Sequence, residues 1–141
     1  MKTYNEFLIE RPGYCDTLKV RVYKTKKTMK RDSEKICKVF KYEIKSGDFD
    51  AVWTDTPNAK CKYTQGKASP LMFGVMFFNE EKLTTDIIAH ECLHSSFSHD
   101  YFVTQYKGFY NGDDEERLVC YFQWLLLTIL KTLKKAGYKF K

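Results

Sequence analysis

The chain has 141 residues, of which 43% are hydrophobic and 16% aromatic; this is enough for one core and argues against a disordered chain. Length and composition do not support a second full domain, so residues 1–141 are expected to form one. The most apolar segment, Leu118 to Leu130, contains Gln123 and Thr128 and is shorter than the ~20 residues that cross a bilayer. We therefore expect a soluble protein without a membrane-spanning helix.

The first residues mix charged side chains with Pro12 and Gly13, and they lack the apolar stretch of a secretory signal. The five cysteines are odd in number and show no CxxC spacing, which suits reduced thiols better than a disulfide framework. Two of them, Cys92 and Cys120, fall within helical apolar patterns and are predicted core residues. Together these features predict a cytoplasmic protein.

The formal net charge is +6, and the basic residues are concentrated in two places. One group lies between Lys19 and Lys45, and the other closes the chain from Lys131 to Lys141. Both groups fit solvated faces, and the second is favourably placed at the C-terminus of a helix. The alternative interpretation is a surface for an anionic partner such as nucleic acid.

In the first half of the chain, Leu18 to Tyr23 alternates apolar and basic residues, as a half-buried strand does. Asp32 or Ser33 is a candidate cap for a helix whose apolar residues then follow helical spacing. Ala51 to Thr54 predicts a short strand, and the polar stretch 59–69 predicts a loop or a ragged hairpin.

Leu71 to Phe78 is the strongest predicted strand, and it is apolar on both faces. Gly74 inside it indicates a bulge or a close approach of another chain segment. After a turn, Thr84 or Thr85 can cap a helix that is expected to run to about Phe97.

A loop is expected over 99–112, and a long helix from the acidic group 113–116 to Ala136, with Gly137 as its C-terminal cap. The order is strand, helix, two strands and two helices, which predicts an α+β fold. Within it, residues 1–70 form an N-terminal portion of sheet and helix, and residues 71–141 contain the main strand and the last two helices.

His90, Glu91 and His94 form an H-E-x-x-H motif on the second predicted helix. Residues i and i+4 share one helix face, so both imidazoles can reach one ion. Neutral imidazole suits zinc, and a hydrolytic zinc site keeps one position open for water. Glu91 is placed to take a proton from that water as it attacks.

A third ligand has two candidate sources. Asp100 follows the motif as in the extended zincin pattern, but Phe97 stands where that pattern has glycine. The other source is the acidic start of the last helix, with Glu116 preferred and Glu115 as its alternative. We expect Glu116 to face the helix interface because the residues beyond it are apolar and predicted to be buried: Leu118, Val119, Phe122 and Leu125.

The segments GVMFFNEEKLTTDIIAHECLH and DDEERLVCYFQWLL resemble the small, gluzincin-like HExxH metallopeptidases of phages and bacterial mobile elements. The resemblance covers roughly residues 71–130. It implies a small zincin-like domain, with a short mixed or antiparallel sheet packed on the HExxH helix and a long C-terminal helix. It also implies His90 and His94 as zinc ligands, Glu91 as general base and a glutamate at 115 or 116 as third ligand. The strand 71–78 would lie along the cleft and pair with extended substrate.

Tyr101, His99 and Tyr121 are candidates to stabilise an oxyanion or bind substrate, since they lie near the motif in the sequence. His99 is also an off-register variant of the ligand at position 100. The expected function is zinc-dependent hydrolysis of peptide bonds in a peptide or protein substrate. The alternatives are a catalytically silent zinc-binding interaction module and a nucleic-acid-associated protein that uses the basic region 19–45.

Overall fold

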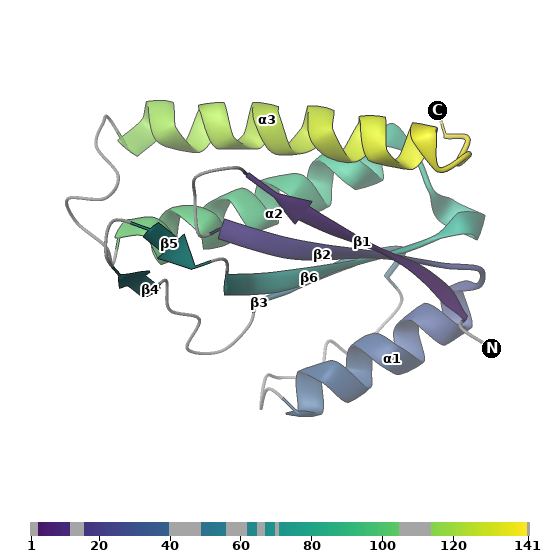
Figure 1. Ribbon diagram of the computed structural model, residues 1–141. Helices are drawn as coiled ribbons and strands as arrows, with labels where there is room; N and C mark the ends of the chain where they lie inside the picture. The colour runs from purple at the N-terminus through teal and green to yellow at the C-terminus, as the bar shows by residue number, and fades with distance from the viewer. Residues whose placement is uncertain are drawn as a thin grey trace.

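The fold is described from a computed structural model of the chain (Figure 1). The structure describes residues 3–11, 16–39, 49–55, 62–64, 67–69, 71–104 and 114–140. The expected loop at 105–112, most of the polar stretch after the third strand and part of the basic region 19–45 lie wholly or partly outside these ranges.

Four strands form one mixed sheet in the order β1-β2-β6-β3. Strand β1 (Tyr4–Glu10) pairs antiparallel with β2 (Asp16–Tyr23), and β2 pairs parallel with β6 (Leu71–Asn79). Strand β3 (Val52–Asp55) pairs antiparallel with the other edge of β6. A separate small hairpin of β4 (Lys62–Thr64) and β5 (Lys67–Ser69) confirms the hairpin alternative for the polar stretch.

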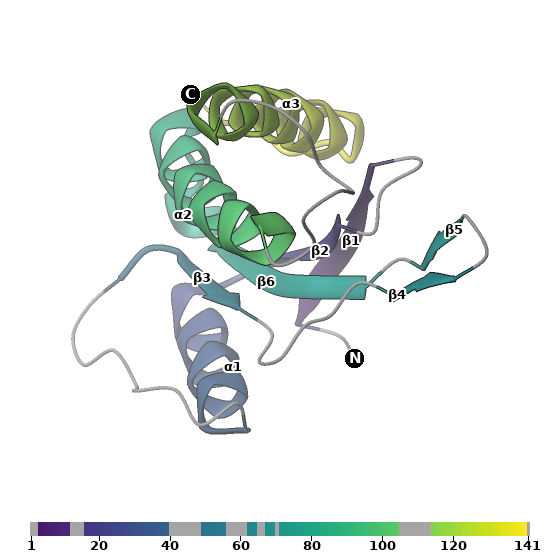
Figure 2. The same ribbon diagram turned by 90° about the vertical axis from the view of Figure 1, so that its left-hand side faces the viewer.

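Helices cover both faces of this sheet. Helix α1 (Lys26–Val39) lies on one face, and α2 (Thr85–Thr104) and α3 (Asp114–Lys135) lie side by side on the other (Figure 2). A 3₁₀ turn, η1 (Glu80–Lys82), leads from β6 into α2. The α+β class is confirmed, and no described helix is long and apolar enough to cross a membrane.

Strand β6 is buried on both faces, as its continuous apolar sequence predicts. Phe73, Met76 and Phe78 belong to the core under α2 and α3, whereas Val75 and Phe77 belong to the core under α1. Both edges of β6 are hydrogen-bonded to neighbouring strands. Pairing of substrate along this strand, which the resemblance implies, is therefore blocked from Gly74 to Phe77, where both edges already have partner strands. Strand β3 is the outer strand beside α2.

Gly74 marks both a bulge and a close approach. The pairing with β2 shifts there, since Thr17 is opposite Met72 and Leu18 is opposite Gly74. A Cβ atom at position 74 would collide with Cη2 of Trp53, because the indole ring of β3 lies directly over the glycine. The same indole donates a hydrogen bond from Nε1 to Oγ of Ser98 on α2, at 2.8 Å. Gly74 thus permits the contact that joins the edge strand to the helix.

The predicted start of α1 is wrong, and strand β1 was not predicted. The helix begins at Lys26, where the Thr25 hydroxyl accepts a hydrogen bond from the backbone N–H of Thr28 at 3.2 Å. Asp32 and Ser33 therefore lie inside the helix, and the prediction that one of them caps it is wrong. Lysine and arginine are good helix formers, so nothing prevents the helix from beginning in this basic stretch.

Helix α2 begins as expected, with the Thr84 hydroxyl accepting from the backbone N–H of Ile87 at 3.3 Å. It continues to Thr104, so the predicted end near Phe97 is wrong. No glycine or proline follows Phe97 within this helix, and the buried His99 holds its last turns against the core. The residues expected to begin a loop at position 99 are helical.

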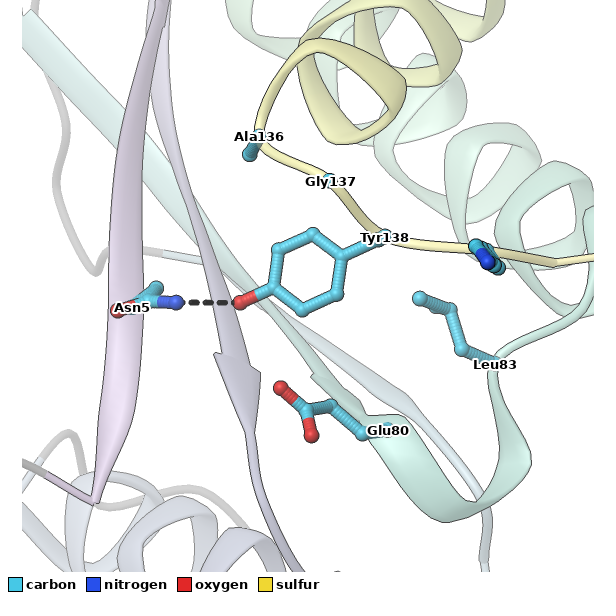
Figure 3. Close-up of a pocket in the computed structure, with 7 residues that line it drawn as sticks. Asn5, Glu80, Leu83, Ala136, Gly137 and Tyr138 are labelled. Atoms are coloured by element: carbon cyan, nitrogen blue, oxygen red, sulfur yellow. Dashed lines mark hydrogen bonds between the residues drawn. The ribbon is translucent and has the colours of Figure 1, made fainter.

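Helix α3 ends in the predicted glycine cap. Gly137 has φ of 96°, and the backbone N–H groups of Gly137 and Tyr138 bond to the carbonyls of Lys134 and Leu133, both at 3.0 Å. The chain then returns to β1, where the Asn5 side-chain amide donates to the Tyr138 hydroxyl (Figure 3). A hollow of about 430 Å³ lies beside this contact, lined in part by Leu83.

Gly74→Ala is expected to lower the free energy of unfolding by about 1–3 kcal/mol, because the new methyl group must displace the Trp53 indole. Urea denaturation of wild-type and variant protein measures this loss. In a Trp53→Ala background the same substitution should cost much less, since the colliding ring is gone. Equal costs in the two backgrounds would show that the glycine is needed for another reason.

Candidate metal centre on helix α2

His90 and His94 lie on the exposed face of α2, one turn apart, and their rings converge. The two Nε2 atoms are 3.1 Å apart. Two nitrogen ligands of a tetrahedral zinc ion, each ~2.0–2.1 Å from the metal, lie about 3.3 Å from one another. The separation of the two nitrogens is therefore close to the one that a shared ion requires. A hydrogen bond between the two neutral rings would give a similar separation.

Glu91 points to a different side of the helix from the two histidines, and it is only 5% exposed. Beside it is an open cavity of about 440 Å³, lined by Phe49, Asp50, Ala51, Asp86, Ile87, His90 and Glu91. The carboxylate that the motif assigns to proton transfer thus lies in the wall of a cavity that also includes a metal-ligand candidate. The next residue, Cys92, faces the core, and burial raises its pKa to about 12, with a smaller contribution from the negative charge of Glu91. Its predicted core role is confirmed.

Three contacts position the wall of this cavity opposite α2. The Lys26 ammonium pairs with the Asp50 carboxylate at 2.8 Å, and the Asn79 side-chain amide donates to the Asp50 carbonyl at 2.8 Å. Further along β3, Trp53 bonds Ser98, as described above. The segment entering β3 is therefore held by α1, β6 and α2 at once, and the cavity has walls from distant parts of the chain.

The candidate third ligands lie apart from the histidine pair. Among the residues that the structure describes, no group of three or more His, Cys, Asp or Glu side chains is arranged to hold a metal ion. Glu116 is exposed and accepts a hydrogen bond from the Cys120 thiol at 3.3 Å. Glu115 is also exposed, and Asp100 pairs with Arg117 at 2.8 Å across the α2–α3 interface.

The buried side of α3 explains the position of Glu116. This side consists of Tyr121, Leu125, Ile129 and Leu133, and Glu116 lies five residues before Tyr121, ~140° around the helix. Val119, expected to be buried, is 50% exposed. The prediction that Glu116 faces the helix interface is therefore wrong, because the apolar residues after it do not all face one side.

Cys120 lies on the same exposed side as Glu116, so its predicted core role is also wrong. The hydrogen bond that its thiol donates to Glu116 raises the pKa of Cys120. Residue 120 follows a helical apolar pattern in the sequence, but the pattern does not specify which of the apolar residues contact the sheet.

His99 and Tyr121 belong to an aromatic cluster in the core. Their rings are stacked with centroids 3.5 Å apart and an angle of 1°, and each side chain is 1% exposed. A guanidinium nitrogen of Arg11 lies 3.3 Å from Nε2 of His99, and Phe73 contacts both rings. Neither residue lines the cavity at Glu91, and Tyr101 is 73% exposed. The structure thus does not bring these three candidates into the cavity wall.

The cavity is also lined by two carboxylates that were not predicted as site residues, Asp50 and Asp86. Asp86 lies one turn before His90 on the same helix face. The four-residue spacing of positions 86, 90 and 94 could therefore have predicted that Asp86 lies near the site. Asp50 had no such signal, because it approaches α2 only through the folding of the sheet. Comparisons of the chain with known protein families, curated proteins and solved structures gave no match.

His99→Ala is expected to lower the free energy of unfolding by about 2–4 kcal/mol, as truncation of a fully buried ring does. His90→Ala, on the exposed face of the same helix, should change it by less than about 0.5 kcal/mol when a chelator is present. Urea denaturation of the two variants measures the difference. A larger loss in His90→Ala would contradict the assignment of the two faces of α2.

Proposed function

We propose that this protein is a zinc-dependent metallopeptidase that hydrolyses peptide bonds in an extended peptide or protein substrate. The observation that carries the proposal is the convergence of the His90 and His94 Nε2 atoms at 3.1 Å, beside a cavity walled by Glu91. The resemblance to small HExxH metallopeptidases supports it independently of this geometry.

The residues present fit a zinc ion. Both imidazoles converge from successive turns of one rigid helix, and neutral imidazole nitrogen is a preferred zinc ligand. His90 and His94 would hold the ion at the exposed surface of α2, where substrate has access to it. Glu116 remains the first candidate for a third ligand and Glu115 and Asp100 the alternatives, although none of the three is grouped with both histidines among the described residues.

The reaction follows from the roles of these side chains. When bound, zinc supplies a positive charge that polarises a carbonyl and activates water near neutral pH. Glu91 accepts a proton from the attacking water and then gives it to the departing amine nitrogen. Its low exposure keeps most of the side chain from bulk water, while its place in the cavity wall puts it beside the space that substrate would occupy.

The position of β3 supports an extended peptide as substrate. Strand β3 is the outer strand of the described sheet on the side of α2, and the cavity lies at the segment that leads into it. A peptide that adds to the edge of a sheet gains main-chain hydrogen bonds whatever its side chains are. We propose that β3, rather than β6, takes this role, so that the bound peptide passes the cavity at Glu91.

Wild-type protein is expected to bind about one zinc ion per chain, and His90→Ala and His94→Ala should each lose it, because one imidazole alone holds the ion weakly. Glu91→Gln should retain the metal but hydrolyse peptides about 10²–10⁴-fold more slowly than wild-type protein, since the amide cannot accept the proton. Metal analysis of purified protein and cleavage of a peptide library measure the two properties.

The outcomes separate the proposal from its alternative. Equal, substoichiometric zinc in wild-type and His90→Ala protein would contradict the proposal that His90 and His94 bind zinc. Stoichiometric zinc in wild-type protein without cleavage of any library peptide would favour the catalytically silent binding module instead. His99→Phe is the matched control, since it removes the third histidine of the chain from the core and should leave zinc binding unchanged.

Glu116→Gln tests the third ligand with little risk to the fold. The side chain is exposed, so the melting temperature should change by no more than a surface substitution causes. If Glu116 is the ligand, zinc affinity should fall at least tenfold, and calorimetric titration with zinc measures it. Unchanged affinity removes Glu116 from the ligand set. Asp100→Asn then becomes the next variant, and it should also lower the melting temperature because it weakens the pair with Arg117.

A further inference from the structure

Helix α1 presents a straight row of basic side chains on its exposed face. Lys27, Arg31, Lys35 and Lys38 are all exposed and follow one another at intervals of four, four and three residues. At ~100° per residue these four positions fall within ~80° of arc. The row is therefore one continuous surface, on the side of the sheet opposite the histidine pair of α2 (Figure 2).

The fold fixes this row toward solvent. The opposite side of α1 is anchored to the sheet by Met29, which is fully buried, by Ser33 at 1% exposure and by Ile36. Rotation of the helix would expose Met29, which contacts the core formed by Tyr23 and Phe77. The basic side chains thus keep their common direction without any bound partner.

The charge of the row is largely uncompensated. Among the described residues, Lys27, Lys35 and Lys38 form no ion pair, and the Arg31 guanidinium lies 3.9 Å from Asp32. Asp32 is turned toward the sheet, where its carboxylate accepts a hydrogen bond from the Tyr23 hydroxyl at 3.1 Å. Glu34 borders the row and is half-buried. Four cations therefore face solvent, and the two acids of α1, Asp32 and Glu34, lie beside them.

From this row we infer that the exposed face of α1 binds the phosphate backbone of a nucleic-acid duplex. From position 27 to position 38 the helix rises ~16 Å. A duplex presents one phosphate of each strand per ~3.4 Å of its axis, so a segment of this length offers enough phosphates for all four cations. A row of four cations at intervals of three or four residues complements such a repeating anion, and phosphate contacts of this kind do not depend on the base sequence.

Other anionic partners fit this face less well. A helix that lies on a lipid surface inserts an apolar side, but the apolar side of α1 is buried against the sheet. Protein interfaces centre on aromatic and apolar side chains, and lysine is depleted from them. The exposed positions of the row carry only lysine and arginine, with no aromatic ring on which an unpaired base could stack. A duplex backbone is the partner that these side chains suit.

Binding of the full chain to a fluorescent 20-base-pair DNA duplex tests the inference by anisotropy between 50 and 200 mM salt. Contacts to four phosphates predict a slope of about −3.6 in log affinity against log salt, a loss of roughly 150-fold over this range. The triple variant Lys27→Gln, Arg31→Gln, Lys35→Gln should reduce the slope to about −1, because each removed cation releases one phosphate contact. Glutamine is a comparable helix former, so α1 should remain folded.

The matched control is Lys131→Gln, Lys135→Gln, Lys139→Gln, which removes three exposed charges from and just beyond the end of α3, across the sheet from α1. Both variants have the same net charge. Loss of affinity only in the α1 variant supports the inference, whereas equal loss in both, or no binding at 50 mM salt, overturns it. Preferential binding to anionic phospholipid vesicles or to polyglutamate would also overturn it. The inference is independent of the proposed peptidase activity.

Discussion

The pairing of β6 on both edges and its burial on both faces is the constraint from which the remaining architecture follows. Because β6 lies between β2 and β3, it carries core residues under α1 and under the α2–α3 pair at once. Its one glycine then admits the Trp53 indole, and that ring bonds Ser98 on α2. Strand β6 thus leads into α2, the HExxH helix, and through Gly74 it also determines how β3 approaches α2.

The candidate metal ligands and the core residues of helix α2 lie on different sides of the helix. Ile88, Cys92 and His99 face the core, whereas the metal-ligand candidates face solvent. Glu91 lies between these sides, buried but in the wall of the cavity. A single helix can therefore present two imidazoles and a fixed carboxylate together, because a step of one residue turns the side chain by ~100°.

The two proposed surfaces lie on opposite faces of the sheet. The histidine pair belongs to the layer of α2 and α3, and the basic row belongs to the layer of α1. The two layers meet through Lys26 at the start of α1, which pairs with Asp50 in the cavity wall.

The local features of the fold can be predicted from the sequence alone. Alternation predicted β2, and a continuous apolar run predicted β6. The caps at Thr84 and Gly137 follow from local backbone chemistry, and the spacing of the HExxH motif predicted the converging imidazoles. These features depend on residues within a few positions of each other, which is the range over which propensity and spacing act.

Tertiary contacts, in contrast, establish which side of each helix is buried and which strand lies at the edge of the sheet. The apolar residues after Glu116 are numerous enough to allow several buried sides, and contact with the sheet selected the one through Tyr121 and Leu125. The same holds for Asp50, which reaches the cavity from a distant part of the chain. Such contacts depend on strand order and crossing geometry, and no local pattern encodes either.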